Sequence, residues 1–410
     1  MNSKPSDLIE MEAALQTLLQ AACPLGPAEQ VPTIQALGRV LAADVRSPID
    51  VPPAANTQMD GYAVRSADLG QPGTRLRVTQ RIAAGHVGQA LGAGEAARIF
   101  TGALIPEGAD AVVMQEQCVA QADTVIVQHV PKAGEWVRPQ GCDVQAGSVV
   151  LRAGHRLRPQ DLGQAASVGI ATLAVAPRPR VALLSTGDEL TQPGAPLRLG
   201  AIYNSNRFLL AGLLQGLGCA VTDLGQVPDR LDATQDAMRQ AAEAHDLVLT
   251  SGGVSVGGED HVKPAVQSLG RLALWQIAMK PGKPLAFGSL RRAAGDTTAH
   301  FIGLPGNPVS SFVTFLMFVR PFLLALQGAN TCGPRVLRLP SASDWLKADT
   351  RREFLRARLD ADGRVELFPN QNSAVLTSTV WSDGLVDNAP GKTFKAGELV
   401  NFLPYSDLLN

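Results

Sequence analysis

The sequence predicts a multidomain α/β and β protein, in which a central α/β domain with a mostly parallel sheet is joined to separate β domains. Strands and helices alternate over residues 180–326, which is typical of a parallel sheet covered on both faces. Short alternating stretches separated by Gly, Pro and Asp fill residues 46–141, and the helical period disappears after residue 329. At roughly 100–200 residues per domain, the 410 residues suggest about two to four domains.

The composition disfavours several classes of protein. Hydrophobic residues make up 45% and charged residues 18%, which is an ordinary globular balance. The net charge of −1 disfavours a nucleic-acid-binding protein, which usually carries a basic excess. The 5 cysteines and 6 histidines form no C-x-x-C or H-x-x-x-H pattern, so zinc, haem and disulfide frameworks lack support. The most apolar run, Phe312 to Val319, is far shorter than the ~20 residues of a membrane span. We therefore expect a soluble, reduced, cytoplasmic protein.

The N-terminal segment predicts a helix that begins at Asp7 and ends before Pro24, because its apolar residues recur at three- and four-residue spacing. A second short helix is expected over residues 34–41. Residues 142–178 form a connector with a helix candidate at 158–168. Between these segments, an antiparallel β domain is expected from the alternating strands 75–82, 111–115 and 124–130.

The α/β region begins with the apolar strand Val181–Ser185, followed by a helix over 205–217 that Ser205 or Asn206 would cap. In a parallel sheet, ligands bind at the carboxyl ends of the strands. Further strands are expected at 220–224, 246–250, 284–289 and 301–304, with helices at 231–245, 261–270 and 308–326. The C-terminal β domain is expected to contain strands at 335–339, 353–359, 364–368 and 398–402.

Three Gly-rich loops follow strands of the α/β region, at residues 185–190, 250–260 and 303–310. Their glycines let backbone N–H groups converge, their hydroxyls add donors, and a helix begins just beyond each loop, as in anion-binding sites. Two of the loops also contain acids, which are suited to Mg²⁺ or to polarising a nucleophile. A single Gly-rich turn after a parallel strand is a common connection with no binding role. Three such loops in one domain favour a site for phosphate or another anion. None of them matches a P-loop or a Rossmann fingerprint.

Two lysines lie three residues apart in the segment Met279-Lys280-Pro281-Gly282-Lys283-Pro284. The prolines stiffen the turn and hold both ammonium groups in place, which suits a phosphate or a small dianion. The segment Met59-Asp60-Gly61-Tyr62-Ala63-Val64 reads, by itself, as a hairpin turn before a strand.

Together, these segments resemble the molybdopterin molybdenumtransferase family, the MoeA-type enzymes of molybdenum cofactor synthesis that are homologous to the E domain of gephyrin. The resemblance covers nearly the whole chain and is strongest between residues 180 and 320. The motifs that carry it, in the family's order, are MDGYAV, FTGALIPEGADAVV, STGDEL, NSN, TSGGVSVG, MKPGKPLAFG and GLPGNPVSSFVTF.

The family resemblance implies an elongated homodimer, other cofactor-synthesis proteins as possible partners, and a reaction on small molecules. Molybdate would be inserted into adenylylated molybdopterin with the help of Mg²⁺, and AMP would be released. The implied domains are a discontinuous one at 1–45 and 142–178, a β-rich insert at 46–141, the α/β domain at 179–328 and a β-barrel-like domain at 329–410.

Two alternatives remain open. The SGGVSVG loop also resembles that of molybdopterin adenylyltransferases, although those smaller proteins lack the β-rich insert and the C-terminal domain. A non-catalytic scaffold like gephyrin is the other alternative, and the retained Asp60, Glu189, Asp260, Lys280 and Lys283 argue against it.

The loop chemistry and the resemblance together assign roles to individual positions. Catalytic roles fall on Asp60, Thr101, Asp143, Glu189, Asp229, Asp260 and Lys280, with Asp60 and Thr101 contributed across the dimer. Contacts with molybdate or adenylylated molybdopterin fall on Ser251, Gly252, Gly253, Ser255, Lys283, Pro284, Pro305, Pro308, Ser310, Arg351 and Ser373. Carboxylates for Mg²⁺ come from Asp188, Glu189 and Asp260. The chain departs from the family pattern at Gly258, where an acid is common, and at Gln276, where a base is common.

Overall fold

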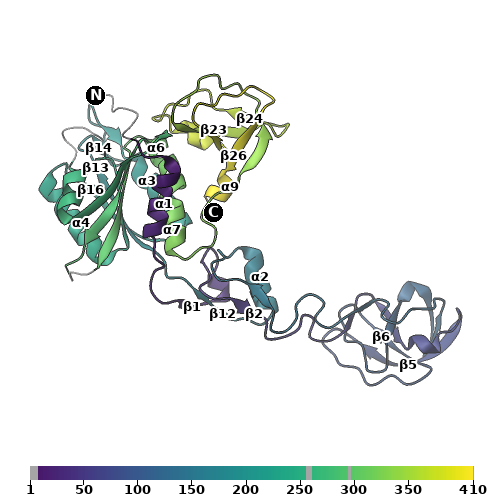
Figure 1. The fold of residues 1–410 in the computed structure, drawn as a ribbon. Coiled ribbons are helices and arrows are strands. Elements are labelled where there is room, and N and C mark those ends of the chain that lie inside the picture. The colour runs from purple at the N-terminus through teal and green to yellow at the C-terminus, as the bar shows by residue number, and fades with distance from the viewer. Residues whose placement is uncertain (1–7, 255–260, 294–296, 410) are drawn as a thin grey trace.

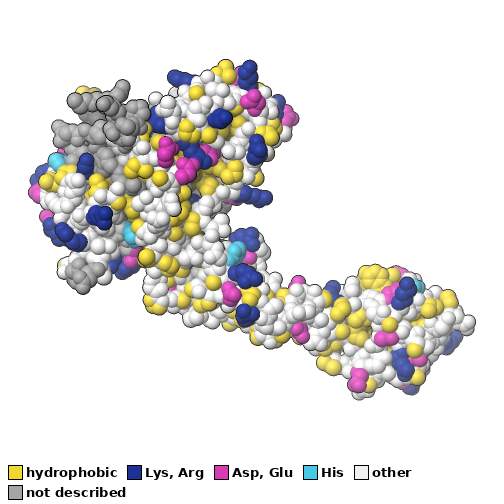
Figure 2. Space-filling model, in the orientation of Figure 1, with side chains coloured by type: hydrophobic (Ala, Val, Ile, Leu, Met, Phe, Trp, Pro, Cys, Tyr) yellow, Lys and Arg dark blue, Asp and Glu magenta, His cyan; other side chains and the backbone are white. Residues whose placement is uncertain are grey.

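The computed structural model describes residues 8–254, 261–293 and 297–409. The molecule is elongated. The α/β layers and the C-terminal β domain lie together at one end, and a narrow middle region leads to the β-rich domain at the other end (Figure 1). Over the face shown in Figure 2, Lys and Arg side chains are interspersed with Asp and Glu, so its described part presents no extended basic surface.

The α/β domain is built on a six-stranded sheet whose strands alternate their side chains between two cores. Val181 and Leu183 face one core, and Ala182 and Leu184 face the other. The strand order is β16 (Ala220–Val227), β13 (Arg180–Thr186), β17 (Leu247–Ser251), β21 (Thr298–Leu304), β20 (Pro284–Arg291) and β18 (Gly270–Gln276). The first four strands pair in parallel and the last two are antiparallel, so the sheet is mostly parallel, as expected.

Helices cover both faces of this sheet, which explains its continuous apolar strands. One face packs against α4 (Leu231–Ala244) and α5 (Val262–Leu269). The other packs against α3 (Ser205–Gly216), the long helix that begins at Pro308, and α1 (Met11–Ala21). The predicted first helix therefore exists, begins at Met11 within the described residues, and contributes Met11, Ala14 and Leu18 to the α/β core.

The long helix consists of α6 (Pro308–Thr314), a π-helical segment (Phe315–Val319) and α7 (Arg320–Leu326). This helix has 19 residues and a mean hydropathy of 1.9, so by length and composition alone it could span a membrane. The shorter run Phe312 to Val319 did not suggest this. However, 94% of the most apolar stretch of the helix is buried, as in the core helix of a soluble protein. The buried Arg320 donates from Nη1 and Nη2 to the carbonyls of Cys332 and Asp407 at 3.0 and 2.7 Å.

The middle region is made by segments from before and after the β-rich domain. Strand β1 (Glu29–Pro32) pairs with β12 (Thr172–Val175), β2 (Val45–Arg46) pairs with β11 (Val149–Leu151), and α2 (Pro159–Ser167) packs beside them. The expected helix over 34–41 is wrong. Only a 3-10 turn, Thr33–Gln35, forms, because Ile34 and Leu37 face solvent, 83% and 55% exposed, and share no buried face.

The β-rich domain contains a second six-stranded sheet. Its order is β7 (Ala111–Met114), β4 (Gly61–Val64), β6 (Glu95–Ile99), β5 (Thr74–Ile82), β9 (Thr124–Val127) and β8 (Cys118–Gln121). The expected antiparallel pairing holds except between β5 and β6, which are parallel. A short pair, β3 (Asn56–Thr57) with β10 (Val137–Arg138), leads into it.

The C-terminal domain forms a third sheet, which includes one strand from the α/β part of the chain. Strand β19 (Met279–Lys280) pairs in parallel with β23 (Arg352–Leu359). The sheet continues through β25 (Gly384–Asn388), β26 (Leu399–Pro404) and β22 (Leu337–Pro340), with β24 (Val365–Leu367) beside β23 and the helices α8 (Thr377–Trp381) and α9 (Tyr405–Leu408). Neither β19 nor β25 was predicted, and β19 ties the Lys-containing turn directly to the C-terminal domain.

Candidate active site

A pocket with a volume of about 800 Å³ lies where the carboxyl ends of the parallel strands meet. Residues from all three Gly-rich loops line it, together with a C-terminal-domain loop at Ala374 and Leu376. Its wall includes nine of the predicted site residues: Glu189, Asp229, Ser251, Gly252, Gly253, Pro284, Pro305, Pro308 and Ser310. The rule that ligands bind at the carboxyl edge of such a sheet therefore locates the pocket correctly.

The loop after β17 can approach the neighbouring strand because it contains two glycines. Gly252 and Gly253 have φ values of +89° and +65°, in the left-handed region. A Cβ atom at Gly252 would lie 2.9 Å from the carbonyl oxygen of Thr186, and one at Gly253 would lie 2.5 Å from Val262 Cγ2. Side chains are thus excluded from this part of the wall, and the backbone itself forms the surface.

Thr186 lines this pocket, and its hydroxyl has no hydrogen-bond partner among the described residues. Its Oγ1 atom is buried and unpaired among the described residues, as are the hydroxyls of Ser185 and Thr250 nearby on the same strand ends. Buried hydroxyls are normally hydrogen-bonded, so an unpaired one on a residue of the pocket wall is a candidate ligand contact. The sequence analysis did not select Thr186, although it precedes the predicted loop Gly187-Asp188-Glu189.

Asn206 connects the loops that form the pocket. Its Nδ2 donates to Ser251 Oγ at 2.8 Å and to the carbonyl of Gly306 at 2.7 Å. The expected cap of α3 at Ser205 or Asn206 is wrong, because the cap is Asn204, whose side chain accepts from the N–H of Arg207. Asn206 is the second residue of the helix, and its side chain reaches across to the other two loops.

The acids of the first loop lie at the pocket edge. Glu189 and Asp229 line the pocket, and Asp188 Oδ1 accepts from the backbone N–H of Asp229 at 3.3 Å. Mg²⁺ is commonly held by one or two carboxylates together with substrate phosphates, so Asp188 and Glu189 have the right chemistry. Within residues 8–254, 261–293 and 297–409, no group of three or more His, Cys, Asp or Glu side chains forms a metal site. Asp260 and Ser255, also predicted, lie outside the described residues.

The C-terminal domain reaches the pocket through the loop that contains Ser373. Asn307 Nδ2 donates to Ser373 Oγ at 3.1 Å, and the N–H of Val309 donates to the Ser373 carbonyl at 3.1 Å. The fully buried Arg356 holds the same loop through the carbonyl of Asn372. These contacts bring the predicted Ser373 to the Gly-Asn-Pro turn of the α/β domain.

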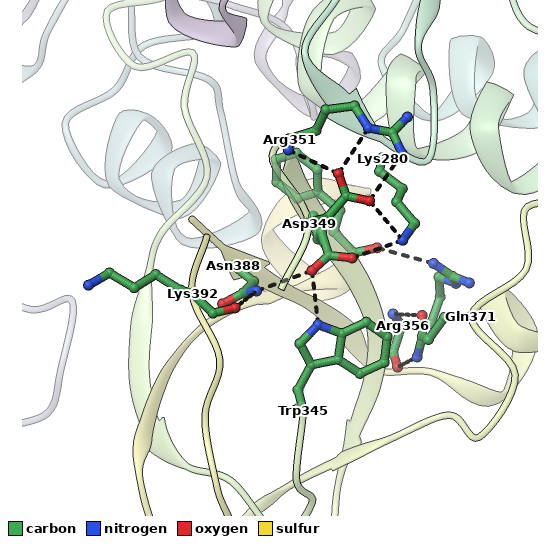
Figure 3. Close-up of polar contacts among 10 residues, drawn as sticks. Lys280, Trp345, Asp349, Arg351, Arg356, Gln371, Asn388 and Lys392 are labelled. Atoms are coloured by element: carbon green, nitrogen blue, oxygen red, sulfur yellow. Dashed lines mark hydrogen bonds and ion pairs between the residues drawn. The ribbon is translucent and has the colours of Figure 1, made fainter. Parts of the chain in front are cut away.

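Lys280 lies in a network of charges where β19 meets the C-terminal domain. Its Nζ lies 3.2 Å from Asp349 Oδ2 and 3.1 Å from Glu353 Oε1. Arg351 grips the same Asp349 carboxylate through Nε and Nη2, both at 3.1 Å. Figure 3 shows Lys280 and Arg351 directed toward Asp349. Burial by itself would raise the pKa of Asp349, but the hydrogen bonds from Arg351 and Lys280 outweigh it and hold the pKa well below its usual range.

The fold therefore brings two predicted site residues together through acids that the sequence analysis missed. Glu353 is 1% exposed, and its second oxygen accepts from Trp345 Nε1 at 2.9 Å and from Asn388 Nδ2 at 3.3 Å. The R-x-E-F pattern, in which Arg351 was selected, contained Glu353 as the only sign of this network. Lys280, Lys283 and Arg351 are not among the residues found to line the large pocket in the described part of the chain.

Three predicted residues lie far from this pocket within the subunit. Asp60 Oδ1 accepts from both the N–H and the hydroxyl of Thr101, each at 2.7 Å, in the β-rich domain. The backbone hydrogen bond from Thr101 is the main cause that lowers the pKa of Asp60. Asp143 lies in the chain between the β-rich domain and the middle region, where its N–H donates to the carbonyl oxygen of Val51. Figure 1 shows the β-rich domain at the opposite end of the molecule from the α/β sheet.

Three family models match consecutive parts of the chain. They are the MoeA N-terminal region, domains I and II, over residues 9–169, a probable molybdopterin-binding domain over 182–325, and the MoeA C-terminal region, domain IV, over 338–405. A molybdopterin molybdenumtransferase from Haemophilus influenzae is 40% identical over 92% of this chain and 93% of its own length. The chain belongs to the molybdopterin molybdenumtransferase family.

Other members of the molybdopterin molybdenumtransferase family agree with this assignment. The protein of that name from Synechococcus elongatus is 36% identical over 95% of this chain and 97% of its own length. The crystal structure of the MoeA molybdopterin biosynthesis protein from Pyrococcus horikoshii superposes with a TM-score of 0.83. It is 28% identical and covers 97% of this chain and all of its own, so the expected multidomain fold is confirmed.

Proposed function

We propose that this chain inserts molybdenum into molybdopterin. Its substrates would be molybdate and adenylylated molybdopterin, and its products molybdenum cofactor and AMP. The observation that carries the proposal is the pocket in which three Gly-rich loops, at the carboxyl ends of β13, β17 and β21, face a loop of the C-terminal domain. Membership of a family whose members are named for this transfer supports the same reaction.

The pocket has the donors that a phosphorylated substrate needs. The backbone of the Ser251-Gly252-Gly253 loop and the unpaired Thr186 hydroxyl would contact phosphate oxygens, because backbone N–H groups and hydroxyls bind anions without a large basic surface. Asn206 would keep the loops at a fixed spacing. Mg²⁺, held by Asp188 and Glu189, would supply positive charge beside the phosphates. Pro284, Pro305, Pro308 and Ser310 would shape the wall for the pterin.

Molybdate would bind to the cations at the edge of the C-terminal domain. Lys280 and Arg351 converge on one carboxylate, and this convergence of two cations would also suit a small dianion. Arg351 presents its guanidinium as a fork. Lys283 and Ser373 would complete the surroundings.

A cytoplasmic homodimer would account for the three distant residues. Asp60 and Thr101 are linked by two hydrogen bonds but lie in the β-rich domain, remote from the pocket of their own subunit. The elongated shape would allow that domain to reach the pocket of a second copy. Asp143 would lie at the edge of the same cleft.

The test is an assay with purified protein, adenylylated molybdopterin, Mg²⁺ and molybdate. The proposal expects AMP release and a product that activates an apo-molybdoenzyme. ATP-dependent modification of molybdopterin without AMP release from the adenylylated form would instead identify an adenylyltransferase. Inactivity in both assays would favour a scaffold. Asp60→Asn and Lys280→Ala should abolish insertion while leaving the thermal unfolding transition cooperative.

A further inference from the structure

Asp349 lies between the two cations that are proposed to bind molybdate. Its carboxylate is held by Arg351 Nε and Nη2 at 3.1 Å each and by Lys280 Nζ at 3.2 Å. This fork geometry is the one that Arg offers to any planar or tetrahedral oxyanion. The two oxygens of Asp349 therefore occupy the acceptor positions that two oxygens of a bound oxyanion would use.

The second acid on Lys280 is much more deeply buried, although Asp349 also accepts from the backbone N–H of Arg351 at 3.0 Å. Glu353 is 1% exposed, and its two oxygens are engaged by Lys280, Trp345 and Asn388. Asp349 is 19% exposed, and its partners Lys280 and Arg351 are 38% and 27% exposed, so solvent reaches this end of the network. Glu353 is thus a buried counter-ion of Lys280, whereas Asp349 lies where a dissolved anion can compete with it.

The net charge of this network favours a mechanism in which a bound dianion replaces the Asp349 carboxylate. Lys280 and Arg351 contribute two positive charges, and Asp349 and Glu353 contribute two negative ones, so the network is neutral as it stands. A dianion gains little from a neutral site and is repelled by a carboxylate already in its place. The backbone of Asp349 is anchored, since its carbonyl accepts from the N–H of Gly391 at 2.7 Å. A rotation of the Asp349 side chain would be enough to release both cations.

We propose that Asp349 sets the affinity for molybdate by acting as an internal competitor. Its carboxylate occupies the oxyanion position between Lys280 and Arg351 and turns away when molybdate binds. This inference rests on the proposed function, because it takes these two cations as the molybdate ligands. It makes Asp349 a residue that weakens binding and speeds release of the anion, in contrast to the residues that hold it.

The test measures molybdate binding by isothermal titration calorimetry at constant ionic strength. Asp349→Asn removes the charge and keeps the shape, and we expect its Kd to be at least about tenfold lower than that of the unmodified protein, ~1.4 kcal/mol. Asp387→Asn is the matched control. Asp387 is also an acid gripped by an arginine on this sheet, with both oxygens 2.6 Å from Arg352, but it does not contact Lys280. Its Kd should stay within about twofold of the unmodified value.

A Kd for Asp349→Asn that is equal to or higher than that of the unmodified protein overturns the inference, as does a failure of both proteins to bind molybdate. Asp349→Ser serves as a second variant if the first does not fold. The double variant Lys280→Ala with Asp349→Asn should lose the tighter molybdate binding expected of Asp349→Asn alone. The proposed function fails separately, either when no AMP is released from adenylylated molybdopterin or when Lys280→Ala and Arg351→Ala leave the molybdate Kd unchanged.

Discussion

The ammonium of Lys280 lies 3.1 Å from Oε1 of Glu353, and this ion pair joins the α/β part of the chain to the C-terminal sheet. The pairing of β19 with β23 places the two residues side by side in register. The charge that is proposed to bind molybdate is therefore held by the C-terminal domain, although it belongs in sequence to the α/β region.

Glu353→Ala should destabilise the protein by about 2–4 kcal/mol, because it removes a buried counter-ion of Lys280 and the acceptor of Trp345 Nε1, together with one of the two acceptors of Asn388 Nδ2. Urea unfolding followed by circular dichroism would show a lower midpoint with an unchanged slope. Glu366→Ala is the control. The pair of Glu366 with Arg358 is 40% and 42% exposed, and its loss should cost at most about 1 kcal/mol. Equal losses in the two variants would contradict the role of burial.

Asn206→Asp should lower the rate of AMP release by roughly tenfold to a hundredfold. The Asp side chain keeps its size but has no Nδ2 to donate to Ser251 and Gly306, so the loops lose their link. Single-turnover assays with adenylylated molybdopterin would measure the rate, and differential scanning calorimetry would show how much of the protein remains folded. A variant with the unmodified rate would remove Asn206 from the positioning residues.

Two glycine-to-alanine changes should have opposite effects on stability. Gly253→Ala should destabilise by about 1–3 kcal/mol, since φ is +65° and the new methyl group meets Val262 Cγ2 at 2.5 Å. Gly212 lies at an exposed position of helix α3 with nothing within 4 Å of an added Cβ, and Gly212→Ala should stabilise by roughly 0.5–1 kcal/mol. Thermal unfolding of both variants gives the comparison, and a stabilised Gly253→Ala would contradict the described loop conformation.

Mixed dimers should test the proposed site between two subunits. Asp60→Asn and Lys280→Ala, each inactive alone, are expected to recover about a quarter of the unmodified activity after refolding together, because half of the dimers then contain one intact site. Asp60→Asn mixed with Thr101→Ala should recover nothing, since both residues belong to the same half-site. Recovery in neither mixture would place both halves of the site within one subunit.

Stability should fall in acid partly through Asp161. Burial raises its pKa, but hydrogen bonds from Arg158 and His155 prevail and lower it from 3.8 to about 2. A pKa depressed by folding contributes stability above the unfolded pKa, and that contribution disappears as the pH falls from about 4 to 2. Asp161→Asn should reduce the pH-dependent part of the free energy of unfolding by roughly 1–2 kcal/mol. This figure is already lowered because solvent screens the exposed partners of Asp161. Urea unfolding at pH 5 and pH 3 measures the difference, and an unchanged difference would contradict the assignment.

The sequence by itself determined the alternating strands and helices of the α/β domain, because Val181–Ser185 and similar runs are apolar on both faces and can only be buried between helix layers. It also located the pocket, because the Gly-rich loops follow parallel strands whose carboxyl ends must share one edge. The family motifs supplied the identity of individual site residues, which local patterns alone left open.

Only the tertiary structure decided how distant segments meet. The two residues of β19 are too short to signal a strand, and pairing with β23 depends on a partner more than 70 residues away. The Asp349 and Glu353 counter-ions of Lys280 could not be selected in advance, because an ion pair between remote residues leaves no local periodicity. For the same reason the expected helix at 34–41 was wrong: Val40 and Leu41 form bridges with the distant Arg156 and Val175, and these contacts outweigh local propensity.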